Sequence, residues 1–284
     1  MSKCIEYTIN VGGKLLDLSA PCVMGILNVT PDSFYTSVSP DGSTTETDIS
    51  GLVGKHLADG ATIIDIGGCS TRPGSKAVDE AGEWERLAKS LDIIRRDYPD
   101  AIISVDTFRP AIAERCIREY GVHIINDVSG GCDEMFDVVA KYGVPYILTF
   151  NEPRNESENI CIRELQFFAE KVQQLRDRGA KDIILDPGFG FNKSMDDNYA
   201  ILSNMENLAM LDLPVLVGVS HKSMIFKLFG TTPAKALNGT TILNTVALAK
   251  GANILRVHEV REAMECIAIS NKLHETRISP KNNS

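Results

Sequence analysis

The sequence predicts a (β/α)8 TIM barrel of the α/β class, preceded by an N-terminal β-hairpin. The first observation is that eight short runs rich in β-branched residues alternate with longer amphipathic segments. The second is that the short runs are almost wholly apolar, as strands buried on both faces of a parallel sheet are. The third is that the chain of 284 residues has no linker-like stretch, so we expect a single domain over residues 1–284.

The expected elements follow in order along the chain. The opening segment alternates around a Gly-Gly pair, which predicts a hairpin that closes the N-terminal end of the barrel. Strands are expected at 23–28, 62–67, 102–106, 122–127, 145–150, 182–188, 214–220 and 253–258. Helices are expected between them, among others at 80–98, 109–120, 163–178 and 237–250. A doubly wound open sheet, with its site at one switch point, is the alternative.

Glycines support the expected helix ends. A helix often ends with a residue of positive φ, which glycine adopts without strain. Such a glycine follows several of the helical segments, at Gly60, Gly121, Gly143, Gly179 and Gly251.

Charge and cysteine usage restrict the possible partners. The net charge of −9 argues against nucleic acid or a membrane surface as a partner, because both are polyanionic. It leaves room for an anionic small substrate in a locally basic pocket. The seven cysteines are scattered without any CxxC spacing, which predicts free thiols in the cytoplasm. We find no signal peptide and no apolar run long enough to span a membrane.

Polar residues stand at the C-terminal end of almost every expected strand. They include Asn28, Asp65, Asp106, Asn126, Asp127, Asp186, Arg256 and His258, and the cluster 220-SHKS-223. In a parallel barrel these ends open onto one face, where barrel enzymes build their sites. One such residue could be a satisfied rim carboxylate or amide. Six or more on the same face predict a binding site.

These residue types suggest what the site binds. The segment 70-STRPGS-75 supplies hydroxyls, backbone amides and the guanidinium of Arg72, which suit a phosphate group, although a tight turn would explain it too. Arg256 and His258 add positive charge. Donors and acceptors for the edge of a flat heterocycle come from Asp106, Asn126, Asp186 and Lys222. Asn28 and Asp106 could share a Mg²⁺ ion, whereas no HxH, HExxH, Walker A or strand-following GxGxxG pattern occurs.

With these residues assembled, the chain resembles the dihydropteroate synthase family of pterin-binding enzymes from about residue 23 to about residue 269. The two longest matching segments read 24-MGILNVTPDSF-34 and 61-ATIIDIGGCSTRPGS-75. Shorter matches follow in order at 104-SVDT-107, 124-IINDVSGG-131, 184-ILDPGFGF-191, 218-GVSHKS-223, 239-GTT-241 and 255-LRVHEV-260.

The resemblance implies a reaction and a set of ligands. The family joins p-aminobenzoate to 6-hydroxymethyl-7,8-dihydropterin diphosphate, giving 7,8-dihydropteroate and pyrophosphate in folate biosynthesis. By this resemblance the pterin edge is held by Asp106, Asn126, Asp186 and Lys222, with Arg256 stacked on its face. The diphosphate is held by Asn28, Arg72, Arg256 and His258, with Mg²⁺ at Asn28. The aminobenzoate is framed by Thr71, Phe191 and Ser223. The resemblance also implies a homodimer and a sulfonamide target.

Three departures from the family pattern lie near the expected site. His221 stands where the family usually has arginine, 148-LTFNE-152 replaces a Met-His-Met-like run, and 35-YTSV-38 replaces a segment that usually carries Asp-Gly. Because Lys222 and Ser223 are adjacent, we expect His221 to face the ligand. The departures motivate an alternative function, a pterin-binding paralogue without synthase turnover. A methyltetrahydrofolate methyltransferase is a further alternative, but a methyl donor would not need the STRPGS loop.

Overall fold

The computed structural model of the protein describes residues 7–29, 46–69, 78–153 and 157–276. Its main sheet has eight strands in the order β8-β7-β6-β5-β4-β3-β10-β9, all pairs parallel. A bridge between Leu185 and Val215 brings the two edges together. The strands are β3 (Cys22–Asn28), β4 (Ile63–Gly67), β5 (Ile102–Asp106), β6 (Ile124–Asp127), β7 (Tyr146–Thr149), β8 (Ile183–Asp186), β9 (Leu216–Val217) and β10 (Ile254–Val257). The predicted barrel is confirmed, and the open-sheet alternative is wrong.

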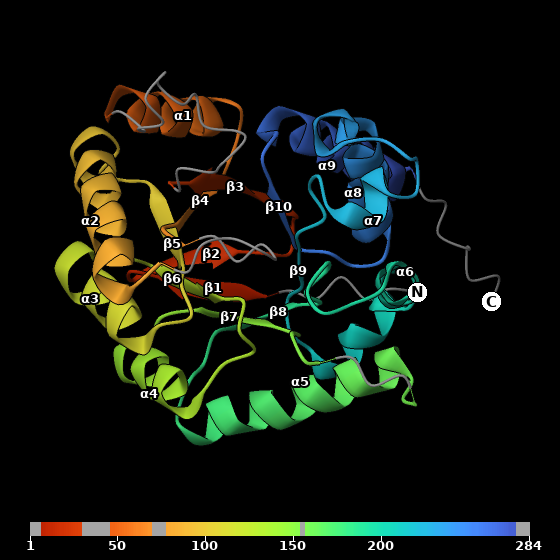
Figure 1. Ribbon diagram of the computed structural model, residues 1–284, viewed down its shortest axis with the longest axis horizontal. Helices are drawn as coiled ribbons and strands as arrows, with labels where there is room; N and C mark the ends of the chain where they lie inside the picture. The colour runs from red at the N-terminus through yellow and green to blue at the C-terminus, as the bar shows by residue number, and fades with distance from the viewer. Residues whose placement is uncertain (1–6, 30–45, 70–77, 154–156, 277–284) are drawn as a thin grey trace, which may run out of the picture.

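Helices surround the barrel (Figure 1). They are α1 (Glu46–Ala58), α2 (Glu80–Asp97), α3 (Pro110–Tyr120), α4 (Asp133–Tyr142), α5 (Ile160–Asp177), α6 (Met195–Ser203), α7 (Ser223–Phe226), α8 (Leu237–Ala249) and α9 (Val260–Glu275), with 3-10 turns η1 (Met205–Leu211) and η2 (Pro233–Lys235). The glycines predicted to end helices all have positive φ. None of the described helices is long and apolar enough to cross a membrane.

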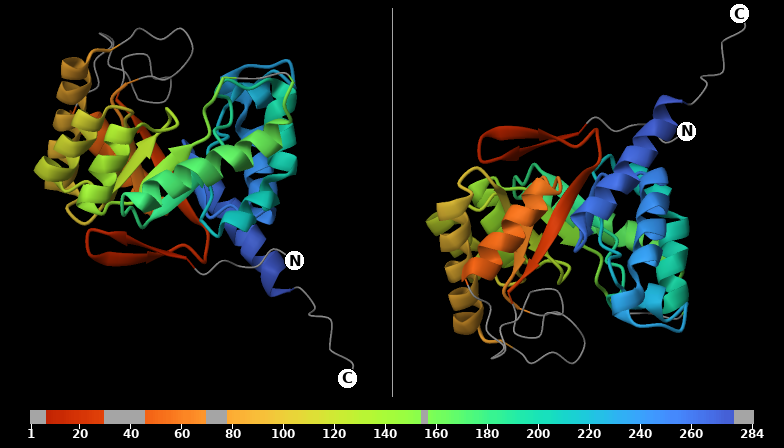
Figure 2. Two further views of the ribbon diagram at one scale, coloured as in Figure 1. Left: turned by 90° about the horizontal axis from the view of Figure 1, so that it is seen from below. Right: turned by 90° about the horizontal axis from the view of Figure 1, so that it is seen from above.

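The N-terminal hairpin covers one end of the barrel (Figure 2). Its strands β1 (Thr8–Val11) and β2 (Lys14–Asp17) pair antiparallel, as predicted. Ile9 and Val11 are buried against the lowest layer of inward-facing strand residues. The backbone N–H of Asn10 donates to Asp182 just before β8, at 2.9 Å. The hairpin therefore closes the end at which the strands begin, as expected.

The alternation of side chains along each strand places the polar groups inside the barrel. Successive inward-facing residues are two positions apart in a strand. At the lower layer these are mostly isoleucines, packed with the hairpin. Two positions further on they become polar, in the pairs Ile63 and Asp65, Ile124 and Asn126, Ile184 and Asp186, and Ile254 and Arg256. The barrel is therefore apolar at the hairpin end and polar at the other end.

Candidate functional site

Arg256 forms the centre of the polar end of the barrel. Its Nε donates to Asp65 Oδ2 at 2.7 Å, and its Nη2 donates to Asp106 Oδ2 at 2.8 Å. Burial would lower the pKa of Arg256, but these two carboxylates raise it, so the guanidinium stays charged. Burial raises the pKa of Asp106, although Arg256 acts in the opposite direction. The two ion pairs fix the plane of the guanidinium group.

Two buried oxygens beside this centre are available to a ligand. Asn126 Nδ2 donates to Asp65 Oδ2 at 3.0 Å, and Asn126 lies next to Asp106 across the β5–β6 ladder. Asp65 Oδ1 and Asn126 Oδ1 are buried and accept no hydrogen bond from any described residue. A buried acceptor without a partner carries a desolvation cost that a ligand donor would remove. This part of the site therefore suits a ligand with N–H groups along one edge.

Asp186 and Lys222 form another part of the site, at the end of β8 and after β9. Asp186 Oδ1 accepts a hydrogen bond from the backbone N–H of Gly188 at 2.8 Å. Lys222 Nζ donates to the carbonyl oxygen of Phe189 and lies 4.6 Å from the centroid of the Phe191 ring. Burial raises the pKa of Asp186, against the influence of Lys222. Burial also lowers the pKa of Lys222 to about 8, against the influence of Asp186.

Lys193 supports the loop after β8, although it was not among the site residues predicted from the sequence. Its Nζ donates to the carbonyl oxygens of Phe150 at 2.6 Å, Gly188 at 2.9 Å and Phe191 at 3.2 Å. Burial lowers the pKa of Lys193 to about 8. The ammonium group thereby ties the end of β7 to the loop after β8. Its position two residues after the DPGFGF segment was the only sequence signal.

Asn28 lies where the metal ligand was expected. Asn28, Gly67 and Asp106 are neighbours across β3, β4 and β5. A methyl group built on Gly67 would lie 3.3 Å from Asn28 Oδ1 and 3.9 Å from Asp106 Oδ2, so glycine keeps the space between these oxygens open. Both are hard oxygen donors of the kind that Mg²⁺ takes. No group of three or more potential metal-ligating His, Cys, Asp or Glu side chains occurs in the described part of the chain. The residues fit a Mg²⁺ ion that takes its other ligands from a phosphate group and water.

The remaining expected residues divide into two groups. His258 Nδ1 lies 2.8 Å from Ser220 Oγ, and Ser223 begins α7 directly after Lys222. These three belong to the loops that follow β9 and β10, on the same side of the barrel as Asp186. Thr71 and Arg72 lie outside the described residues, as does the departure at 35–38.

Comparison with known proteins assigns this arrangement to a family. A family profile described as "Pterin binding enzyme" matches residues 24–258. The dihydropteroate synthase of Streptococcus pyogenes is 39% identical, over 93% of this chain and 100% of the relative. This chain belongs to the dihydropteroate synthase family.

Solved structures of other dihydropteroate synthases have the same fold. The Yersinia pestis enzyme, solved in complex with a sulfonamide drug, matches with a TM-score of 0.87 and 32% identity, over 95% of this chain and all of that one. The Xanthomonas albilineans enzyme, solved with 4-aminobenzoic acid, matches with a TM-score of 0.86 and 32% identity, over 96% and 100%. The likeness therefore covers nearly the whole chain.

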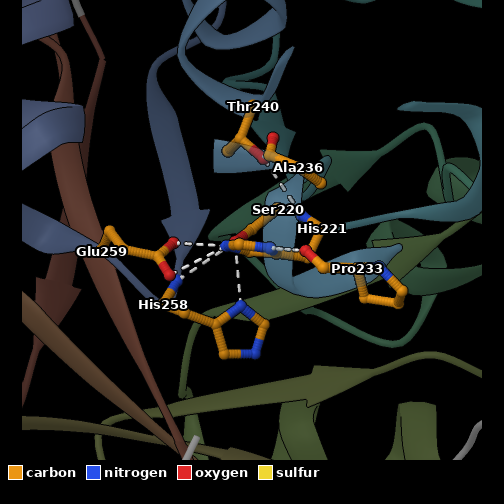
Figure 3. Close-up of polar contacts among 7 residues, drawn as sticks. All are labelled: Ser220, His221, Pro233, Ala236, Thr240, His258 and Glu259. Carbon is orange, nitrogen blue, oxygen red and sulfur yellow. Dashed lines mark hydrogen bonds and ion pairs between the residues drawn. The ribbon is translucent and has the colours of Figure 1, made fainter. Parts of the chain in front are cut away.

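The first described departure from the dihydropteroate synthase pattern is held by protein groups. His221 Nδ1 lies 2.6 Å from the carbonyl oxygen of Pro233, and Nε2 lies 2.8 and 2.9 Å from the carboxylate oxygens of Glu259 (Figure 3). Both ring nitrogens are thus engaged within the protein, whereas the sequence led us to expect a side chain that faces the ligand.

The second departure likewise contributes structural contacts. Asn151 donates to the carbonyl oxygen of Val128 at 2.7 Å and accepts from Asn192 Nδ2 at 2.8 Å. Glu152 forms a two-bond ion pair with Arg163, at 2.7 and 2.6 Å. Asn151 therefore links the loops after β6, β7 and β8, and the replacement leaves the site around Asp186 and Lys222 assembled.

Proposed function

We propose that this chain condenses p-aminobenzoate with 6-hydroxymethyl-7,8-dihydropterin diphosphate, releasing 7,8-dihydropteroate and pyrophosphate. The observation that carries the proposal is the set of buried polar groups at the barrel mouth, found in a chain that matches dihydropteroate synthases over nearly its whole length. Unpartnered acceptors, a buried carboxylate and a half-buried lysine suit the amino and keto edge of a pterin.

We assign the pterin pocket to Asp106, Asn126, Asp186 and Lys222. A carboxylate of Asp186 can accept two N–H bonds from an amino-pyrimidine edge, and Lys222 can donate to a ring nitrogen or a keto oxygen. Asp65, which the sequence placed at a strand end without a predicted role, keeps Arg256 in place by its 2.7 Å ion pair. Arg256 would then present the face of a fixed guanidinium to the pterin ring.

The proposed chemistry requires no nucleophile from the enzyme. The bond between the pterin methylene carbon and the diphosphate oxygen breaks, and its electron pair leaves with pyrophosphate. Positive charge develops on the electron-rich pterin, where the carboxylates of Asp106 and Asp186 stabilise it. The amine nitrogen of p-aminobenzoate then forms the new C–N bond and loses a proton.

The leaving diphosphate needs positive charge, which we assign to Arg72, Arg256 and His258. Asn28 would hold Mg²⁺, which when bound neutralises the phosphate oxygens. Arg72 and Thr71 enter this assignment through the sequence resemblance alone.

We assign the p-aminobenzoate subsite to Thr71, Phe191 and Ser223. Phe191 supplies an apolar wall beside Lys222, and Ser223 follows Lys222 directly. Because a sulfonamide drug is bound by the Yersinia pestis relative, we propose that sulfonamides compete with p-aminobenzoate here too.

A pyrophosphate-release assay with Mg²⁺ tests the function. We expect release that requires both substrates and stops when p-aminobenzoate is omitted. Tight binding of the pterin diphosphate by calorimetry, without any turnover, would instead favour the non-catalytic pterin-binding alternative. Methyl transfer from methyltetrahydrofolate, without pyrophosphate release, would favour the methyltransferase.

We further propose that the chain acts as a single-domain homodimer in the cytoplasm. Four apolar side chains are exposed on the packed pair α8 and α9, with helical spacing in each: Ile242, Val246, Ile269 and Leu273. A second copy would cover such a face. Five of the described cysteines, Cys22, Cys116, Cys132, Cys161 and Cys266, are free thiols, as suits a reducing compartment. Light scattering should give a dimer that Val246→Glu dissociates and Met210→Glu, on an exposed residue of η1, does not.

A further inference from the structure

The backbone at His221 has an unusual conformation for a residue with a side chain. Its φ is +52°, in the left-handed region that costs most residues free energy. The backbone N–H of His221 donates to Thr240 Oγ1 at 3.1 Å, and that hydroxyl donates to the carbonyl oxygen of Ala236 at 3.0 Å. Thr240 of α8 therefore holds the turn between β9 and α7 through this hydrogen bond.

The ring of His221 holds the same turn from two further elements. Nδ1 faces the carbonyl oxygen of Pro233 in η2, and Nε2 faces the carboxylate of Glu259, which precedes α9 (Figure 3). A carbonyl and a carboxylate only accept hydrogen bonds, so both nitrogens must donate. A neutral imidazole carries one N–H, and only the imidazolium satisfies both contacts.

The environment supports the charged form. Burial would lower the pKa of His221, but the hydrogen bonds to Glu259 and Pro233 raise it above the ordinary value. Among the described residues, Glu259 and the imidazole of His258 are titratable groups that face the ring, and the His258 centroid lies 5.7 Å from that of His221. From η2 the ring contacts the neutral carbonyl of Pro233, and from α8 the backbone N–H of His221 contacts the hydroxyl of Thr240.

This ion pair joins the two loops that carry proposed substrate ligands. Lys222 and Ser223 follow His221 directly, while His258 precedes Glu259. Between the same loops, Ser220 Oγ lies 2.8 Å from His258 Nδ1. We propose that His221, as an imidazolium paired with Glu259, is a positioning residue. It holds the loop of Lys222 in a fixed position relative to the loop of His258, so that both can bind the pterin diphosphate.

The proposal rests on the proposed function and explains why a histidine can stand at this position. The ring reaches Glu259, and its charge cancels a carboxylate one residue away from a proposed phosphate ligand. Loss of that charge would loosen the turn and leave the Glu259 carboxylate repelling the diphosphate. Binding of the pterin diphosphate should then suffer more than binding of p-aminobenzoate.

The test uses steady-state kinetics of pyrophosphate release between pH 6 and pH 9 with four variants. His221→Gln removes the charge, His221→Arg makes it permanent, Glu259→Gln removes the partner, and His274→Gln is the control at an exposed histidine near the end of α9. We expect His221→Gln to raise KM for the pterin diphosphate about tenfold at pH 6.5 and KM for p-aminobenzoate less than threefold. His274→Gln should match the wild type.

The pH profiles separate a positioning role from a merely structural one. The ratio of kcat/KM in His221→Arg to that in the wild type should rise with pH, because only the wild type loses its charge. Unchanged KM in His221→Gln, or a constant ratio from pH 6 to pH 9, would overturn the proposal.

A measurement on the unaltered protein tests the proposal even if the variants fail to fold. Histidine ring NMR of the wild type at pH 6.5 should show both nitrogens of His221 protonated, and a neutral ring would overturn the proposal. Calorimetric binding of the pterin diphosphate to the wild type and His221→Gln needs no turnover. A wild type that binds it but releases no pyrophosphate would therefore contradict the proposed reaction while leaving this proposal testable.

Discussion

Individual residues at the barrel mouth have shifted pKa values because they are buried beside an opposite charge. Asp186 has a raised pKa because it is buried, yet Lys222 and the Gly188 N–H favour its charged form. Each N–H group that a ligand donates to this carboxylate stabilises its charged form. We therefore expect Asp186 to contribute more to ligand affinity than a typical single side chain.

Replacement of Asp186 tests this contribution. Asp186→Asn should weaken binding of a pterin that lacks the diphosphate by one to two orders of magnitude, because a charge-assisted hydrogen bond contributes about 1.5–3 kcal/mol. Titration calorimetry measures the effect. Asp182→Asn, just before the other end of β8, is the matched control and should leave affinity unchanged. Equal affinities in all three proteins would remove Asp186 from the pocket.

The sequence predicted the ligand roles of most of this cluster, but it placed Asp65 at a strand end without assigning it a role. Asp106, Asn126, Asp186 and Lys222 could be predicted because each stands at the end of a recognisable strand. Asp65 stands in the same kind of place, but its role depends on Arg256, which is 191 residues away. No local pattern encodes that pairing. The same holds for His221, whose partners come from three elements after it.

Connections between elements rely on a few buried polar groups. Glu83 in α2 is fully buried, accepts from Thr107 Oγ1 at 2.6 Å just after β5, and pairs with Arg109, which precedes α3. Arg109 also donates to the carbonyl oxygen of Val78 at 2.6 Å. This network holds the start of α2 next to the strand end that carries Asp106.

Disruption of this network should destabilise the fold. Glu83→Gln leaves the Arg109 guanidinium without its charged partner, and such a loss costs about 3 kcal/mol for a buried pair. Chemical denaturation followed by circular dichroism gives the free energy of unfolding. The exposed pair Arg115–Glu119 supplies the comparison, since Glu119→Gln should cost less than about 1 kcal/mol. Similar decreases in the free energy of unfolding for the two variants would show that burial does not make the Glu83–Arg109 pair more important than an exposed pair.

The His221–Glu259 pair should make stability depend on pH. The folded-state pKa of His221 is raised, so its stabilisation is complete below about pH 6.5. It is lost as the pH rises through the folded-state pKa. The difference in Tm between the wild type and His221→Gln should therefore shrink from pH 6 to pH 9. A difference that grows with pH would show that the neutral ring is the stabilising form.

At the scale of the whole molecule, the N-terminal hairpin covers the end of the barrel opposite the site with apolar side chains. The sequence predicted this hairpin from its Gly-Gly turn and alternating pattern, and the eight strands from their apolar runs. It could not show that β9 has only two residues in the ladder, or that a single bridge links β8 to Val215. Both depend on how strand tilt and stagger close the ring.

Substitutions in the hairpin test its contribution to the global fold. Ile9→Ala should lower the free energy of unfolding by about 2–5 kcal/mol, because the side chain is fully buried in the lower barrel layer. Leu15→Ala, on the neighbouring strand, removes a side chain that is 74% exposed and should change it by less than about 0.5 kcal/mol. Urea unfolding compares them. A cost for Ile9→Ala below 1 kcal/mol would show that the hairpin is dispensable.

The barrel closes by pairing its last strand with its first, Ile254 with Cys22, and this has a consequence for synthesis on the ribosome. Arg256 comes from that last strand, whereas Asp65 and Asp106 are made much earlier. A growing chain thus holds two neighbouring carboxylates without their counter-charge until β10 emerges. Because like charges are costly to bury together, we expect these carboxylates to disfavour closure of the ring before β10 is available. Arrival of a single arginine then completes both the ring and the pocket.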